Sequence, residues 1–198
     1  GPIAELMGDV PVIVSAGRAF PVETRYLGKP PADRFRDNFC PAASSAVKKA
    51  LSDETGSILV FLPGEGEIRR VENLLNDSPL PGDVDLLPLY GALPQNQQDK
   101  AISPPPAGRR KIVLATAIAE TSLTIEGIRV VVDGGQSRGP RFDPQSGMTQ
   151  LFTEPVSLAG ATQRQGRAGR LEPGICYRLW DKAAEGSFRQ FAQPEILN

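Results

Sequence analysis

Apolar runs alternate with amphipathic segments along most of this chain, which is the pattern of strands and helices following one another. The apolar runs predict strands at 11–15, 20–27, 57–62, 85–89, 110–115, 128–133 and 175–180. The segments between them predict helices at 42–52, 65–76, 95–102 and 119–122, and a last helix that carries 163–170. Residues 138–142 and 148–152 predict a β-hairpin across a turn at 143–147. Because helices separate most of the strands, the sequence predicts an α/β fold with a mostly parallel sheet.

The composition narrows the possible functions. The chain has 198 residues, enough for one domain with a sizeable core, and its 22 Lys and Arg nearly balance 23 Asp and Glu. This balance disfavours a strongly basic nucleic-acid clamp, so any contact with nucleic acid is expected to be local or shared with another domain. Histidine is absent, which removes a His-based catalytic triad and the commonest metal ligand, and we expect no metal site.

Cysteine usage and hydropathy give expectations about location. Cys40 and Cys176 lack the CxxC spacing, and we expect both to be free thiols. No segment reaches the roughly 18 apolar residues of a membrane span. We therefore expect a cytoplasmic protein without a membrane partner. Residues 1–10 are expected to be a linker from a preceding domain or a remnant of cloning, and residues 11–198 to form a single domain.

The chain lacks the phosphate-binding loop of a self-sufficient nucleoside triphosphatase, typically GxxxxGK[ST]. None of its lysines is followed by Ser or Thr. The Asp53-Glu54 pair precedes a predicted turn instead of ending a strand, so it does not have the setting of a magnesium-binding carboxylate. We expect this chain not to hydrolyse ATP alone.

An arginine-rich segment at 163–170, Gln-Arg-Gln-Gly-Arg-Ala-Gly-Arg, carries the candidate chemistry. Arg167 and Arg170 are three residues apart, and on a helix they would lie on the same face. Such a pair of permanently charged, planar donors suits a triphosphate, whose charge must be neutralised in the transition state. The alternative is a solvated basic helix end.

Several segments together, in the same order along the chain, resemble the DEAH/RHA group of superfamily 2 helicases. Residues 163–170 resemble motif VI and the segment 115–125, Ala-Thr-Ala-Ile-Ala-Glu-Thr-Ser-Leu-Thr-Ile, resembles motif V. Further resemblances are to motifs IV, IVa and Va, at 59–68, 89–94 and 131–133. The resemblance covers only the second RecA-like domain of these enzymes. It implies a RecA-like three-layer α/β/α domain of the P-loop NTPase superfamily fold that lacks its own Walker A motif.

The resemblance also implies roles for individual residues. The nucleotide-facing set would be the catalytic Arg167, Arg170 and Gln163, with Ser122, Thr124 and Glu126 binding the nucleotide. The RNA-binding set would be Gly64, Thr116 and Ala117. Most relatives have Asn at the position of Ala117, so one hydrogen bond to RNA, worth about 0.5–1.5 kcal/mol, is expected to be lost here.

In the intact enzyme the resemblance implies ATP and Mg²⁺, held mainly by a missing first RecA-like domain. The implied partners are single-stranded RNA, with DNA as the alternative, and the first and the C-terminal domains of the same chain. This domain would be part of an ATP-dependent RNA helicase, while the fragment alone would be inactive. The rival hypothesis is a non-catalytic RecA-like nucleic-acid-binding or regulatory module, although such a module would have no use for the arginine pair.

Five single-residue alternatives stay open at this level. Arg164 is either a nucleotide-facing residue or a salt-bridge residue, and Gly64 serves a tight turn, RNA contact or both. Thr124 is either a capping residue or a nucleotide contact. Ile102 belongs either to a helix core or to a base contact, whereas packing is favoured over base stacking for Trp180.

Overall fold

The computed structural model describes residues 19–28, 35–121, 123–143 and 147–192. The strand expected at 11–15 lies outside these residues. The main sheet has six parallel strands in the order β1-β8-β5-β2-β4-β3. Their bounds are β1 Val22–Tyr26, β2 Ser57–Phe61, β3 Val84–Leu89, β4 Arg110–Ala115, β5 Ile128–Asp133 and β8 Gly174–Arg178. The predicted α/β class with a parallel sheet is therefore confirmed.

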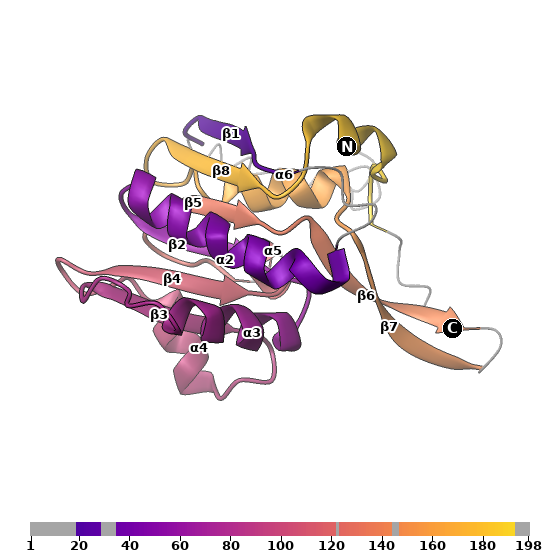
Figure 1. Ribbon diagram of the computed structural model, residues 1–198, viewed down its shortest axis with the longest axis horizontal. Coiled ribbons are helices and arrows are strands. Elements are labelled where there is room, and N and C mark those ends of the chain that lie inside the picture. Colours follow the sequence, from indigo (N-terminus) through magenta and orange to yellow (C-terminus); the bar gives the residue numbers. More distant parts are fainter. Residues whose placement is uncertain (1–18, 29–34, 122, 144–146, 193–198) are drawn as a thin grey trace, which may run out of the picture.

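Helices cover both faces of the sheet and make three layers (Figure 1). On one face lie α2 (Phe35–Asp53) and α3 (Glu65–Asn76). On the other lie α4 (Gln95–Ile102), α5 (Ile118–Thr121) and α6 (Leu158–Gly166). A 3₁₀ segment, η1 (Lys182–Ser187), follows β8.

The central strand β2 shows why the sequence contains uninterrupted apolar runs. Its alternate side chains serve different cores, because successive residues of a strand point to opposite faces. Ile58 and Val60 pack with α2 and α3, whereas Leu59 and Phe61 pack with the α4–α5 side. Every residue of β2 is buried. A parallel strand covered on both faces must be apolar throughout, as this one is.

A two-stranded antiparallel hairpin projects from one end of the sheet (Figure 1). It consists of β6 (Gln136–Asp143) and β7 (Met148–Pro155), both longer than the sequence predicts. Apolar side chains remain exposed on β7, with Met148 at 60% and Leu151 at 68% exposure. The hairpin thus contributes little to the core and presents its surface outward.

Two helix boundaries differ from the prediction. The helix expected at 42–52 begins at Phe35, ahead of Pro41, because Phe39 and Cys40 are buried against the sheet. Their burial offsets the hydrogen bond that the proline cannot donate.

The helix expected to carry residues 163–170 ends at Gly166, so Arg167 and Arg170 do not share a helix face. Beyond this end Gly169 packs against the backbone of Phe20, whose N–H donates to the Gly169 carbonyl at 2.8 Å. A side chain at position 169 would collide with that backbone, which explains why this position is a glycine.

Candidate functional site

The end of α6 forms one side of a small depression with a volume of about 60 Å³. Its opposite side is the loop that leads into β5. Four of the residues predicted to face a nucleotide line it together: Thr124, Glu126, Arg167 and Arg170. The remaining lining residues are Ile125, Gly127, Ile128 and Leu171. The structure therefore brings residues from two separate motifs to one place.

The two arginines of this depression have different surroundings. Arg170 is exposed, and its Nη1 donates to Thr124 Oγ1 at 3.2 Å. Arg167 is only 7% exposed and donates to the backbone carbonyls of Leu123, at 2.7 Å, and Glu120. Burial and the neighbouring charge of Arg170 lower the pKa of Arg167. Arg170 is thus the accessible cation, whereas Arg167 also holds the loop after α5 in place.

Two other predicted nucleotide residues do not join this depression. Gln163 is exposed on α6, four residues before Arg167, and is not among the lining residues. Ser122 lies outside the residues that the structure describes. Of the two roles left open for Thr124, the capping role is disfavoured, because its hydroxyl accepts from Arg170 and the residue lies beyond the end of α5.

Arg164 is a buried salt-bridge residue, with 1% exposure. Its guanidinium contacts Glu120 Oε1 at 2.6 Å and Asp133 Oδ1 at 2.8 Å, and it also donates to Ser137 Oγ at 2.8 Å. It stacks over the Phe61 ring, 5.0 Å from the ring centre. Of the two interpretations left open by the sequence, the ion-pair interpretation is correct.

This network connects four elements that are far apart in the sequence. Glu120 lies on α5, Asp133 ends β5, Ser137 begins the hairpin and Arg164 lies on α6. Asp133 Oδ1 also accepts from the N–H of Gly135, at 2.9 Å. Sequence reasoning missed Glu120 and the partnership of Asp133, because their separations from Arg164 of 44 and 31 residues leave no local signal.

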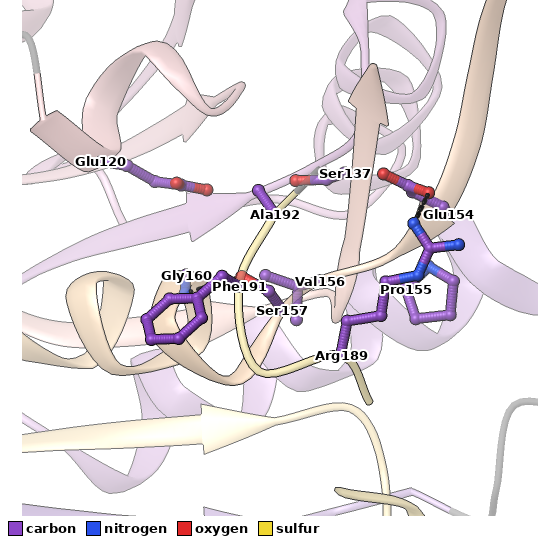
Figure 2. A pocket seen from close by; sticks show the side chains of 10 residues that line it. All are labelled: Glu120, Ser137, Glu154, Pro155, Val156, Ser157, Gly160, Arg189, Phe191 and Ala192. Atoms are coloured by element: carbon purple, nitrogen blue, oxygen red, sulfur yellow. Dashed lines mark hydrogen bonds and ion pairs between the residues drawn. The ribbon is translucent and has the colours of Figure 1, made fainter. Parts of the chain in front are cut away.

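A second depression, also of about 60 Å³, lies at the amino end of α6 (Figure 2). Its lining residues are Glu120, Ser137, Glu154, Pro155, Val156, Ser157, Gly160, Arg189, Phe191 and Ala192. The carbonyls of Arg189 and Gln190 accept the first N–H groups of α6, from Leu158 and Ala159, and Ser157 Oγ accepts from Gly160 N–H at 3.1 Å. Those helix donors are engaged within the chain, so they are not free to bind a phosphate.

The residues predicted to bind RNA lie at the carboxyl ends of two neighbouring strands. Gly64 follows β2 and precedes α3, while Thr116 and Ala117 directly follow β4. These strand ends are adjacent, since Leu62 N–H donates to the Ala115 carbonyl at 2.8 Å. Ala117 is exposed and Thr116 is half-buried. The three predicted residues thus share one edge of the sheet.

The turn at Gly64 does not require a glycine for its backbone conformation. Its φ of −165° and ψ of 177° are extended values that any residue adopts. The space beside its Cα is instead filled by the guanidinium of Arg138. The conformational explanation considered from the sequence is therefore wrong. The atoms nearest to an added Cβ would be the ends of the flexible side chains of Arg138 and Glu67, which can move.

The basic run at 109–111 serves the fold. Arg109 forms a bidentate pair with Asp85, at 2.7 and 3.0 Å. Arg110 donates to backbone carbonyls at the end of α2, and Lys111 donates to those at the end of α4. Burial lowers the pKa of Lys111 to about 8. These cations are engaged within the domain and are poor candidates for nucleic-acid contact.

The described residues show neither a metal site nor a membrane-spanning helix. Within the described parts of the chain, no group of three or more Cys, Asp or Glu side chains could hold a metal ion. None of the helices in the described residues is long and apolar enough to cross a membrane. Cys40 and Cys176 are free thiols, and Trp180 is packed in the interior, as the sequence predicts. Both cysteines and Tyr177 are buried as well.

Comparison with known proteins decides the family. Residues 42–172 match the family described as the helicase conserved C-terminal domain. The chain belongs to this family. The matched segment contains β2, β4, β5 and α6, and with them both arginines of the depression, Arg167 and Arg170.

Relatives of this helicase C-terminal domain include bacterial and eukaryotic proteins. The chain is 53% identical over 195 residues to the ATP-dependent RNA helicase HrpB of Escherichia coli (strain K12), covering 98% of this chain and 24% of that protein. It is 46% identical over 180 residues to the pre-mRNA-splicing factor ATP-dependent RNA helicase prp22 of Schizosaccharomyces pombe, covering 88% of this chain and 15% of that protein. The chain thus spans about a quarter or less of the length of these relatives.

A solved structure also matches closely. The crystal structure of the Escherichia coli DEAH/RHA helicase HrpB superposes with a TM-score of 0.86 at 52% identity, over 99% of this chain and 24% of that one. The expected RecA-like fold and the resemblance to DEAH/RHA helicases are therefore confirmed.

Proposed function

We propose that this domain is the second RecA-like domain of an ATP-dependent RNA helicase and supplies arginines to ATP held mainly by a first domain. The observation that carries the proposal is the convergence of Arg167 and Arg170 with Thr124 and Glu126 in one depression. Two cations beside a hydroxyl and a carboxylate suit the two ends of a nucleotide. The arginines would meet phosphate oxygens, and Glu126 would accept hydrogen bonds from ribose hydroxyls.

The size of the depression supports a divided site. Its volume of about 60 Å³ is far below the roughly 300–1,000 Å³ of a complete small-molecule pocket. It can receive part of a nucleotide, so we propose that the rest of the site, including the phosphate loop and Mg²⁺, lies on the first domain. Arginines supplied from outside the phosphate loop contribute roughly 10³–10⁵ to the rate of phosphoryl transfer in related systems.

The two arginines take different parts in this proposal. Arg170 is exposed and loosely bonded, so it can turn toward a phosphate without losing more than one hydrogen bond. Arg167 donates to the carbonyls of Glu120, within α5, and of Leu123, just beyond it, and so positions the loop that carries Thr124. Closure onto the first domain would bring both toward the γ-phosphate, with Gln163 presented from the exposed side of α6.

We further propose that Gly64, Thr116 and Ala117 contact the sugar-phosphate backbone of single-stranded RNA at the carboxyl edge of the sheet. Their position and small size suit a contact with backbone atoms, which tolerates different base sequences. Of the three, Ala117 is exposed, Thr116 is half-buried and Gly64 is buried. RNA is favoured over DNA because the relatives HrpB and prp22 are named as RNA helicases. Separation of the RNA face from the nucleotide depression would allow ATP-driven domain closure to move the RNA.

The experiment is ATP hydrolysis by the full-length protein with and without single-stranded RNA, beside the isolated 198-residue chain. We expect RNA-stimulated turnover from the full-length protein and none from the isolated chain. Turnover by the isolated chain, or its sub-micromolar affinity for ATP, would mean that the phosphate site is misplaced. Absence of turnover by the full-length protein with any nucleic acid would favour the non-catalytic module instead.

A further inference from the structure

Arg138, at the base of the hairpin, lies directly on the turn at Gly64. A methyl group at position 64 would overlap the Nη1 atom of Arg138. Since Gly64 has an extended backbone, its missing side chain serves to admit this guanidinium. An arginine from the hairpin thus occupies the surface where we place an RNA contact.

The guanidinium is held in this position from two sides. Arg138 Nη2 donates to the Glu67 carboxylate at 3.1 and 3.4 Å, and Nε donates to Thr153 Oγ1 at 3.3 Å. Glu67 belongs to the first turn of α3, and Thr153 lies on the partner strand β7. The side chain of Arg138 is still 33% exposed, and that of Glu67 26%. An ion pair this exposed is weak and can exchange one anion for another.

We propose that Arg138 is a further RNA-binding residue, whose guanidinium takes a backbone phosphate beside Gly64. This inference rests on the RNA-binding function proposed above. Guanidinium groups bind phosphate in a bidentate manner. Arg138 also neutralises Glu67, which would otherwise repel RNA at this turn.

The basic residues of the strand starts cannot take this role, because they lie at the opposite ends of the strands from the predicted RNA-binding residues. Arg109 and Arg110 lie at the beginning of β4, whereas Gly64 and Thr116 follow strand ends. Arg138 is an arginine that the structure places in contact with the predicted RNA turn itself. Arg138 would thus add a positive charge to the proposed RNA-binding edge formed by Gly64, Thr116 and Ala117. The sequence pattern does not indicate this residue.

The test measures binding of a fluorescently labelled oligouridylate to the full-length protein across about 50–200 mM KCl. For Arg138→Gln we expect the slope of log K against log salt to fall by about 0.7, the value of one single-strand phosphate contact. Arg138→Lys should keep the slope because it keeps the charge. Arg189→Gln is the matched control, since Arg189 is an exposed arginine with only a 3.7 Å contact to Glu154.

A second variant tests the contact with the turn. In Gly64→Ala the methyl group would displace the guanidinium of Arg138, so this substitution should weaken RNA binding at least as much as Arg138→Gln. Adding Arg138→Gln to Gly64→Ala should then weaken binding no further. Circular dichroism melting of each variant checks that the fold is intact.

The outcomes separate the two proposals. An unchanged salt slope in Arg138→Gln, or full additivity with Gly64→Ala, overturns the role of Arg138 while RNA binding by the native protein stands. If the native protein binds no oligouridylate, the proposed RNA-binding function fails and the role of Arg138 with it.

Discussion

Replacing Arg164 with methionine should be among the most destabilising single changes in this domain. Methionine fills part of the volume over Phe61 but leaves Asp133 and Glu120 without their cation. The side chain of Asp133 is fully buried, and that of Glu120 is 17% exposed. Removing one partner from a buried ion pair typically costs about 3–5 kcal/mol. Because domains are stable by only about 5–15 kcal/mol, Arg164→Met should remain folded but lose a large share of its stability.

The assay is urea unfolding of the 198-residue chain, with the free energy of unfolding extrapolated to water. Arg189→Met is the control, since Arg189 is 58% exposed and its 3.7 Å ion pair should contribute less than about 1 kcal/mol. Adding Asp133→Asn to Arg164→Met removes the unpaired buried charge, so the double variant should be less destabilised than the sum of the singles, by about 1–3 kcal/mol. A cost for Arg164→Met no greater than that of Arg189→Met would refute the reasoning.

Two further predictions concern buried titratable groups. Since burial lowers the pKa of Lys111 to about 8 from its usual 10.5, the unfolded state binds more protons between these values. The free energy of unfolding of the native chain should therefore rise relative to Lys111→Met as the pH increases through this window, and a fall in urea titrations would contradict the assignment. Burial raises the pKa of Cys176 to about 12, so little thiolate forms at pH near 8. Neither Cys176 nor the buried Cys40 should react with a disulfide reagent until urea unfolds the chain, and fast reaction of the native chain would contradict this burial.

The predictions that succeeded rest on patterns local in sequence. The helix Glu65–Asn76 and the strands Arg110–Ala115 and Ile128–Asp133 have the predicted bounds. Each is set by apolar spacing and by nearby proline or glycine. Burial on both faces of the sheet makes such segments uniform enough to recognise without an alignment.

The failures arise where distant segments meet. The segment after α6 meets the start of the described chain, where Gly169 contacts Phe20, and the partners of Arg164 come from α5 and β5. The sequence indicates a turn at Gly64, yet the guanidinium that fills the space beside its Cα comes from Arg138 on the hairpin. None of these contacts leaves a periodic signal, so they could be found only with coordinates.

For the candidate site, the resemblance selected residues that the fold then gathers. Thr124, Glu126, Arg167 and Arg170 line one depression although more than 40 residues separate Thr124 from Arg167. Which arginine is accessible could not be predicted, because it depends on the carbonyls that the loop after α5 presents to Arg167.

The central claim is that Arg170 acts on a nucleotide bound elsewhere, and single-turnover ATP hydrolysis by the full-length protein with single-stranded RNA tests it most directly. In Arg170→Ala the rate of the hydrolysis step should fall by roughly 10³-fold or more. The affinity for ATP should change little by comparison, and Arg189→Ala should behave as the native protein. A hydrolysis rate for Arg170→Ala equal to that of the native protein would contradict the account.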